Sequence, residues 1–256
     1  MNTGRLAISA TLFAALTVGC SAAPASTQQA TPSPAATVSA TATGSPSPAA
    51  TITTLGNGDE GLAAGTYRLD LANAETVRDG ESRWPAALVT VPDGWSNHDG
   101  WLVLRGGLET TTVAVQFWSV AQVYGNPCKW QGTLFTPGPT VDDLVKALVA
   151  RPLRNATKPT DVMVDGNPGR YLEWSVPAGI DFATCDADQG TNYFESWKGP
   201  LDNSDRYQQA PGQIDRLWIV NISGDRLVID AFSMPSATSA DIKELLAVVA
   251  SIRFSR

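Results

Sequence analysis

The chain has 256 residues, of which 25 are acidic and 18 basic, so its formal net charge at pH 7 is −7. All the acids but only 17 of the basic residues follow residue 54, which gives that part of the chain a net charge of −8. A surface of this sign disfavours nucleic acid and anionic lipid as electrostatic partners, and the length suffices for one domain with a substantial core.

The first residues predict export. A single basic residue, Arg5, precedes an apolar run from Leu6 to Val18. This run suits a signal peptide and is too short to cross a membrane as a helix. The ending Leu16-Thr17-Val18-Gly19-Cys20 resembles the lipobox of bacterial lipoproteins, with Thr17 where that pattern prefers Leu.

We therefore expect residues 1–19 to be a signal peptide and lipid on Cys20 to anchor the protein to the outer face of the cell membrane. Cleavage after Ala22 or Ala23 is the alternative and would give a secreted protein. Of the 34 residues that follow Cys20, 29 are Ala, Thr, Ser or Pro and none is charged. Such a segment has little to bury, so we expect a disordered tether over residues 20–54.

One domain is expected over residues 55–256, with strands separated by turn residues and with two amphipathic helices. Thr140 is expected to begin a helix that Pro152 ends, and Thr238 or Ser239 is expected to begin the last helix. The apolar stripe of the last helix is Ile242, Leu245, Leu246 and Val249. The predicted strands are 65–69, 87–91, 101–104, 112–118, 161–164, 169–176, 193–197, 214–222 and 226–232.

This order predicts an α+β fold in which antiparallel sheet is covered by two amphipathic helices. Five features of the sequence resemble the Mog1/PsbP-like family. They are the series Val91-Pro92-Asp93-Gly94-Trp95, the helix from Val141, the segment Val164 to Arg170, the last hairpin and the ending Val249 to Phe254. The chain is similar in particular to exported modules of actinobacteria, over Leu55 to Arg256. The resemblance implies a Mog1/PsbP-like sandwich and an accessory or binding role, with no catalytic residue to carry over.

Two cysteines, Cys128 and Cys185, remain in the domain. In an exported protein, two cysteines in one domain predict a disulfide, and two alone make a metal site improbable.

The search for catalytic or metal-binding motifs gives no candidate. The one histidine, His98, follows Ser96 and precedes Asp99, but the sequence around it is not a nucleophile elbow, and we interpret His98 as a solvated loop residue. The stretch that begins at Asp186 departs from a calcium loop, because Thr191 stands in place of Gly and Trp197 in place of Glu. We expect no catalytic residue, no metal and no cofactor.

Aromatic residues near the cysteines give the candidate binding site. Trp130 and Trp197 lie in polar segments next to the predicted disulfide, whereas most of the eight tryptophans fit a core. Aromatic and arginine side chains on a rigid loop suit protein or glycan binding. The candidates for partner binding are Trp130, Tyr193, Trp197, Arg206 and Tyr207; the alternative is that these rings only seal a loop.

The sequence thus predicts a lipid-anchored extracytoplasmic accessory module of the bacterial envelope, which is not an enzyme and binds an envelope protein or glycan. Two alternatives remain: an extracytoplasmic hydrolase whose carboxylates cannot be paired from sequence, and a small solute-binding lipoprotein.

Overall fold

The computed structural model describes residues 52–71, 84–200 and 204–255. The predicted signal peptide, Cys20 and the tether as far as residue 51 lie outside these ranges, so lipid attachment stays a prediction. Residues 53 and 54, which the sequence placed in the tether, already pair with a strand of the domain.

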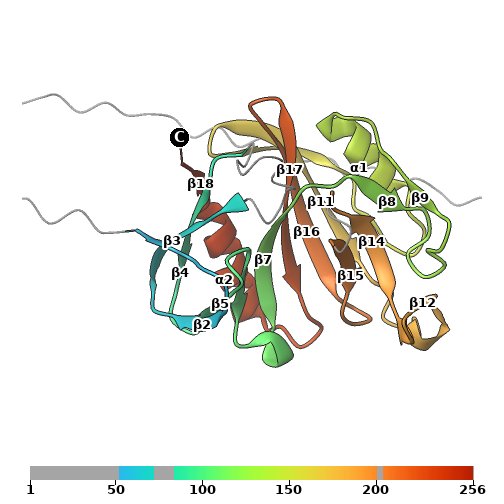
Figure 1. Cartoon of the computed structure of the whole chain (residues 1–256), viewed down its shortest axis with the longest axis horizontal. Helices are drawn as coiled ribbons and strands as arrows, with labels where there is room; N and C mark the ends of the chain where they lie inside the picture. Colours follow the sequence, from blue (N-terminus) through green and yellow to red (C-terminus); the bar gives the residue numbers. More distant parts are fainter. Residues whose placement is uncertain (1–51, 72–83, 201–203, 256) are drawn as a thin grey trace, which may run out of the picture. The chain divides into compact units, whose positions relative to one another are not determined.

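An eight-stranded antiparallel sheet, called here the central sheet, organises the domain (Figure 1). Its β16 and β17 pair over their full length and are joined by Ser223 and Gly224, both at positive φ, as a two-residue hairpin turn requires. This confirms the predicted hairpin. In spatial order the strands are β10 (Thr160–Val164), β11 (Asn167–Ser175), β16 (Ile214–Ile222), β17 (Asp225–Ser233), β7 (Val113–Trp118), β6 (Leu102–Arg105), β5 (Trp95–His98) and β2 (Asp59–Leu62).

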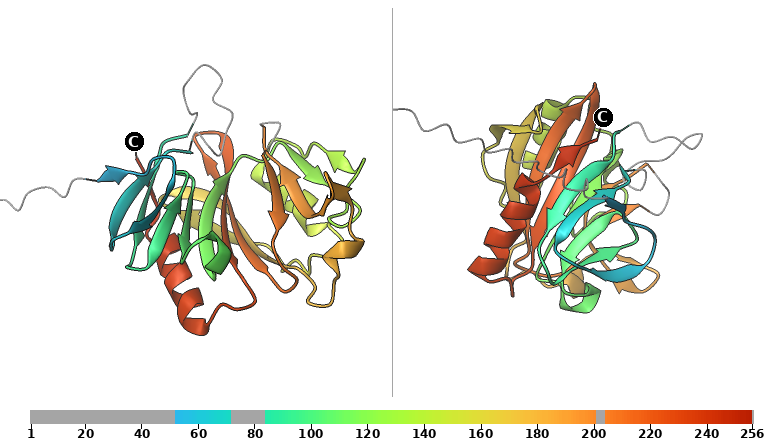
Figure 2. Two further views of the ribbon diagram at one scale, coloured as in Figure 1. Left: turned by 60° about the horizontal axis from the view of Figure 1, so that its bottom comes forward. Right: turned by 90° about the vertical axis from the view of Figure 1, so that its left-hand side faces the viewer.

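Two four-stranded sheets accompany the central sheet (Figure 2). The terminal sheet contains β1 (Thr53–Thr54), β3 (Gly65–Leu69), β4 (Ala87–Val91) and β18 (Arg253–Phe254). The outer sheet contains, in spatial order, β15 (Asp205–Gln208), β14 (Phe194–Lys198), β8 (Gln122–Tyr124) and β9 (Leu134–Phe135). The described residues also form the hairpin β12 (Ala187–Asp188) and β13 (Thr191–Asn192), the helices α1 (Val141–Val149) and α2 (Ser239–Ala250), and the 3-10 turns η2 (Leu108–Thr110) and η3 (Phe182–Thr184).

Both α helices begin at a capping box, as predicted for Thr140 and Thr238. The Oγ1 of Thr140 accepts a hydrogen bond from the backbone N–H of Asp143 at 3.1 Å, and Thr238 and Asp241 repeat the arrangement at 3.2 Å. In return, the carboxylate of each aspartate accepts hydrogen bonds from its threonine. These hydrogen bonds lower the pKa of both carboxyl groups.

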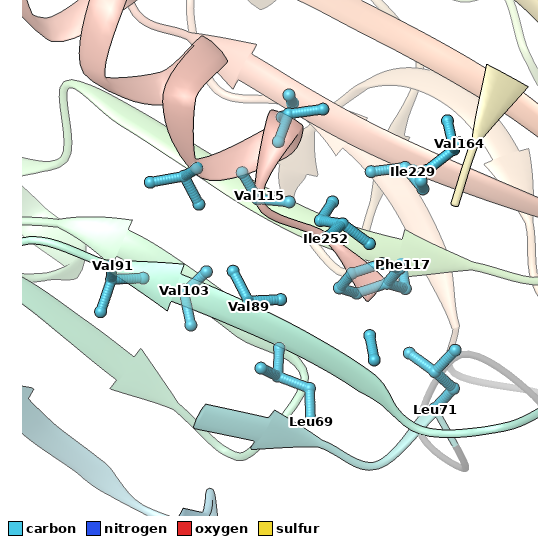
Figure 3. Packing of buried hydrophobic residues seen from close by; sticks show 14 of the residues in the cluster. Leu69, Leu71, Val89, Val91, Val103, Val115, Phe117, Val164, Ile229 and Ile252 are labelled. Atoms are coloured by element: carbon cyan, nitrogen blue, oxygen red, sulfur yellow. The ribbon is translucent and has the colours of Figure 1, made fainter. Parts of the chain in front are cut away.

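The first core lies between one face of the central sheet, the terminal sheet and α2. Figure 3 shows Leu69 and Val89 of the terminal sheet near Val115 and Ile229 of the central sheet. From α2, Leu245 is fully buried in the same cluster. The core is built from aliphatic and aromatic side chains, so the hydrophobic effect is its main source of stability.

The apolar stripe of α2 differs from the predicted one at a single position. Leu246 is 41% exposed, whereas Val248, which the prediction left out, is 1% exposed. The buried face of α2 is therefore shifted around the helix axis, from Leu246 towards Val248, relative to the predicted stripe.

The second core lies on the opposite face of the central sheet, where α1 and the outer sheet pack. Leu148 of α1 meets Leu172 and Leu217 of the central sheet, together with Val123 and Trp197 of the outer sheet. Both faces of the central sheet are therefore covered by other elements.

The predicted α+β sandwich is wrong. The structure is mostly β, with 43% strand and 15% helix. Each helix shares its face of the central sheet with a smaller sheet, so the helices do not cover the sheet by themselves. Between Pro177 and Gly212 the sequence predicts one strand, 193–197, which corresponds to β14, but it does not predict β15; these are two of the four strands of the outer sheet.

Candidate functional site

The predicted disulfide is confirmed. Cys128, in the connection between β8 and β9, is bonded to Cys185, and their Cα atoms are 4.4 Å apart. Both cysteines are buried in a small apolar cluster with Phe194 of β14, whose ring stacks on Phe182 at 5.2 Å between centroids. The bond therefore joins two long connections at the base of the outer sheet.

Hydrogen bonds hold the two connections together beyond the disulfide. The indole Nε1 of Trp130 donates to the carbonyl oxygen of Asp186 at 3.2 Å, and the carboxylate of Asp186 accepts from the backbone N–H of Gln131 at 3.0 Å. Lys129 Nζ lies 3.4 Å from the same carboxylate. Asp186 thus has protein partners. It begins the stretch that departs from a calcium loop, and its contacts hold Trp130 in place.

The outer sheet has one polar face turned into the protein and one face turned away. Along β15, Arg206 and Gln208 are buried, whereas Asp205 is half-buried and Tyr207 is 41% exposed. This alternation is the two-residue period of a strand, with arginine and glutamine where a core normally takes apolar residues.

Two of the five predicted partner-binding residues lie inside the protein. Trp197 has no exposed surface and packs against Trp118 and Trp174 in the second core, at 6.1 and 6.0 Å between ring centroids. Arg206 is 2% exposed and pairs with carboxylates of the central sheet. A partner on the surface cannot contact either of them, so the candidate surface is reduced to Trp130, Tyr193 and Tyr207.

Arg206 is the centre of a buried charge network between the outer and central sheets. Its Nε donates to Asp230 of β17 at 2.7 Å, and its Nη2 donates to Asp215 of β16 at 2.8 Å. Gln116 of β7 also donates to Asp230 at 2.8 Å. Burial raises the pKa of Asp230 to about 6, and Arg206 opposes that rise.

Arg154, from the loop after α1, joins the same network. Its Nη2 donates to Ser196 Oγ and to Gln208 Oε1, both at 2.5 Å, and its guanidinium lies 4.6 Å from the ring centroid of Trp174. Burial lowers the pKa of Arg154 to about 9, with Asp215 acting against that change. The network is enclosed between the two sheets, which fits a structural role.

The face turned away from the central sheet carries four aromatic residues, named here the aromatic face: Tyr124, Trp130, Tyr193 and Tyr207. Tyr193 and Tyr207 meet edge to face at 4.9 Å between centroids, and Tyr124 and Trp130 do so at 5.8 Å. The hydroxyl of Tyr124 donates to Asp205 Oδ1 at 2.7 Å, which ties the second pair of rings to the strand that carries Tyr207. Packed, hydrogen-bonded aromatic rings lose little conformational freedom when a ligand binds.

Glu195 of β14 lies on this face, because it is paired directly opposite Tyr207. It is 5% exposed, and within the described residues its Oε2 has no hydrogen-bond partner. Burial raises the pKa of Glu195 to about 8, with a further contribution from Asp205 and opposition from Arg154.

Sequence reasoning missed Tyr124, Glu195 and Asp205. The signal present in the sequence is a two-residue alternation, Tyr193 with Glu195 and Asp205 with Tyr207, which places each pair on one face of a strand. This alternation does not by itself predict β15, because none of its buried positions is apolar.

His98 is not a loop residue, because it lies in β5 with a half-buried side chain. Its Nδ1 is hydrogen-bonded to the carboxylate of Asp59, and its ring meets Trp101 edge to face at 5.8 Å. Ser96 and His98 line a pocket of about 190 Å³ with Asp59. In the part of the chain that the structure describes, no hydrogen bond joins Ser96 to His98.

Residues 52–71, 84–200 and 204–255 contain no group of three or more His, Cys, Asp or Glu side chains placed to hold a metal ion. In the same ranges, no helix has the length and apolar character needed to cross a membrane.

Comparison with known proteins gives no relative for this chain. No family model matches it, no curated protein matches it and no solved structure matches it. The resemblance to the Mog1/PsbP-like family is therefore not supported by these comparisons.

Proposed function

We propose that the protein is a lipid-anchored, extracytoplasmic binding module of the bacterial envelope, non-catalytic, whose partner docks on the aromatic face. The observation that carries the proposal is the grouping of Trp130, Tyr193 and Tyr207 on the side of the outer sheet turned away from the core, where Tyr124, itself buried, packs against Trp130. The sequence around Cys20 supports the location.

The aromatic face has the physical properties of a binding surface. Tyrosine and tryptophan supply large apolar contact area together with a polar group, and they are enriched among the residues that dominate binding energy. The disulfide between Cys128 and Cys185 and the hydrogen bond from Trp130 hold the supporting connections in place. A rigid surface of this kind reduces the entropy lost on association.

One observation favours the alternative of a hydrolase. Glu195 has a pKa raised to about 8 and is influenced by a second carboxylate, Asp205, which is how glycosidases separate an acid from a base. Asp205 already accepts from Tyr124 and lies 3.4 Å from Lys198 Nζ, and Glu195 is almost fully buried. The binding module is the better supported of the two.

The test is site-specific photo-crosslinking in the envelope of the organism that makes the protein. A crosslinker at Gln209, which is exposed and follows Tyr207 on the same side of the chain, should capture a defined envelope component. A crosslinker at Met163, 65% exposed on β10, is the control and should not capture it.

Tyr207→Ala should abolish capture from Gln209 while the protein remains folded. Equal capture from both positions, or capture unaffected by Tyr207→Ala, would remove the aromatic face as the docking surface. Hydrolysis of an envelope glycan that is lost in Glu195→Gln would establish the hydrolase instead.

A further inference from the structure

Four tryptophans form a continuous series of ring contacts through the second core, called here the tryptophan chain. The rings of Trp101 and Trp118 meet edge to face at 6.0 Å between centroids. Trp197 lies 6.1 Å from Trp118 and 6.0 Å from Trp174. The rings come from the turn before β6 and from β7, β14 and β11, so the tryptophan chain joins the central sheet to the outer sheet.

The two ends of the tryptophan chain differ in exposure. Trp174 and Trp197 have no exposed surface and Trp118 is almost fully buried, whereas Trp101 is half-buried. Trp101 also meets the ring of His98 edge to face at 5.8 Å, and His98 lines the pocket of about 190 Å³. The series of contacts therefore leads from the closed interior to solvent.

The indole N–H groups of the three inner rings have no hydrogen-bond partner among the described residues; these rings are Trp118, Trp174 and Trp197. A buried tryptophan usually places this group on an acceptor, so three exceptions in one cluster require an explanation beyond packing. An indole that has lost one electron becomes acidic at its N–H. Because the inner rings have no acceptor for that proton, the electron deficiency, called here the hole, is not trapped on any of them.

A positive charge lies at the inner end of the tryptophan chain. The guanidinium of Arg154 is 4.6 Å from the ring centroid of Trp174, and a cation at this position opposes the loss of an electron from the ring. The carboxylates of the charge network, Asp215 and Asp230, are shared with Arg206, so they offset the charge of Arg154 only in part. The hole is therefore least stable at this end.

Negative charges lie at the outer end. The side chain of His98, which contacts Trp101, is hydrogen-bonded to the carboxylate of Asp59, and its Nε2 lies 3.9 Å from the carboxylate of Asp99. One imidazole can balance at most one of these two carboxylates. Negative charge stabilises an electron-deficient ring, so the charges at the two ends together favour movement of the hole towards Trp101.

We propose that the tryptophan chain is a relay for one-electron oxidation, which carries a hole from the second core to Trp101 at the surface. An oxidising radical in the surroundings takes one electron from an inner indole, or ultraviolet light ejects that electron to an acceptor in solution. Each neighbouring indole then gives one electron to the oxidised ring, until the hole lies on Trp101. The indole N–H of Trp101 releases its proton to water, and a phenol or thiol in solution returns one electron and one proton.

This activity goes beyond the proposed binding function and does not depend on it. The relay moves oxidative damage away from the inner rings, where an added oxygen atom would disturb close packing and bury a polar group. At Trp101 the same product would lie at the surface, where water can solvate it. Trp101 is thus the site at which we expect oxidation to accumulate.

The test is photo-oxidation of the mature full-length chain. Ultraviolet pulses eject electrons from all eight tryptophans whether or not they are exposed, and hexaamminecobalt(III) in solution takes up the ejected electrons irreversibly. Transient absorption follows the conversion of the indole radical cation to the neutral radical. Peptide mapping by mass spectrometry then locates the tryptophans that carry oxygen added from dissolved dioxygen.

We expect oxidation of Trp101 well above that of Trp130, which is also half-buried but lies outside the tryptophan chain. Trp174 and Trp197 should stay unoxidised, because their holes move outwards. Equal oxidation of Trp101 and Trp130 would mean that exposure alone decides the product, and this outcome would overturn the relay.

Trp118→Phe interrupts the tryptophan chain in its middle. Oxidation of Trp101 should then fall towards the level at Trp130, and oxidation should appear on Trp174 and Trp197. Trp218→Phe is the matched control, because it removes a half-buried ring outside the chain, and it should leave the oxidation of Trp101 unchanged. Unchanged oxidation of Trp101 in folded Trp118→Phe, checked by circular dichroism, contradicts the proposal.

Trp101→Phe tests the same proposal at the half-buried end, where a substitution disturbs the core least. The neutral radical should form more slowly than in the wild type, because the ring that releases its proton to water is gone, and oxidation should move to Trp118. An unchanged rate of neutral-radical formation would overturn the relay even if Trp118→Phe fails to fold. Crosslinking from Gln209 does not involve these rings, so the binding module is tested separately.

Discussion

The first and second cores stabilise the two faces of the central sheet in different ways. The first joins the terminal sheet and α2 to the sheet through apolar side chains, with Leu245 and Ile229 fully buried. The second combines apolar contacts with the charge network of Arg206, Asp215 and Asp230. The comparison shows that both faces of one sheet can be covered even when, on one face, a network of paired buried charges takes the place of part of the apolar contact.

The two kinds of core should also respond differently to mutation. An apolar core loses transfer free energy and gains a cavity when a side chain is shortened, and neighbours relax into part of that space. A buried ion pair that loses one partner leaves an uncompensated charge, which no relaxation of packing removes.

Arg206→Met should be the most damaging change. It removes the cation that Asp215 and Asp230 share, and breaking a buried pair in this way costs about 3–5 kcal/mol. Urea denaturation measures the loss. Arg253→Met is the matched control, because Arg253 is exposed and lies 3.7 Å from Asp165, so it should cost less than about 1 kcal/mol. Similar losses in both variants would mean that the network does not hold the second core.

Leu245→Ala tests the apolar core. The side chain is fully buried in the first core, so its truncation should lower the free energy of unfolding by about 2–5 kcal/mol. Lys243→Ala, on the exposed side of α2, should be nearly silent. Equal effects at the two positions in urea denaturation would contradict the packing of α2.

Reduction of the disulfide should lower the melting temperature and leave the central sheet folded. The bridge closes a loop of 57 residues, for which chain entropy gives a ceiling of about 4 kcal/mol. Calorimetry with and without reductant gives the shift, and circular dichroism shows whether strand content persists. Loss of all strand signal on reduction would show that both cores depend on the bridge.

Glu195→Gln should change stability in a manner that depends on pH. The pKa of Glu195 is about 8 in the folded protein and lies above the ordinary value of 4.5. Between these two pH values the folded state therefore holds a proton that the unfolded state has released. Stability from this group is therefore present below about pH 4.5 and falls as pH rises towards 8. The variant should match the wild type near pH 4 and melt at a higher temperature at pH 8 to 9. A constant difference across this range would mean that Glu195 is ionised in the folded protein.

The sequence predicts features that depend on local pattern. Thr140 and Thr238 begin the helices because each has an acid three residues later, and the hairpin of β16 and β17 follows from long apolar strands around a short turn. The disulfide between Cys128 and Cys185 follows from export and from the number of cysteines.

Strand β15 of the outer sheet could not be predicted in this way, although the predicted strand 193–197 corresponds to β14, and the candidate site depends on both strands. Its inward positions are polar at Arg206 and Gln208, so the apolar alternation that marks a half-buried strand is absent. For the same reason Trp197, which stands among polar neighbours in sequence, was assigned to the surface although it is fully buried. Such strands become recognisable only when their charged partners on another sheet are known.

The parallel pairing of β1 with β3 has a consequence for orientation. Thr53 and Thr54 bring the chain into the terminal sheet, and that sheet covers the face of the central sheet opposite the outer sheet. The chain therefore enters the described domain on one side of the central sheet, whereas Tyr207 lies on the other side. A partner bound at Tyr207 has the central sheet between it and Thr53.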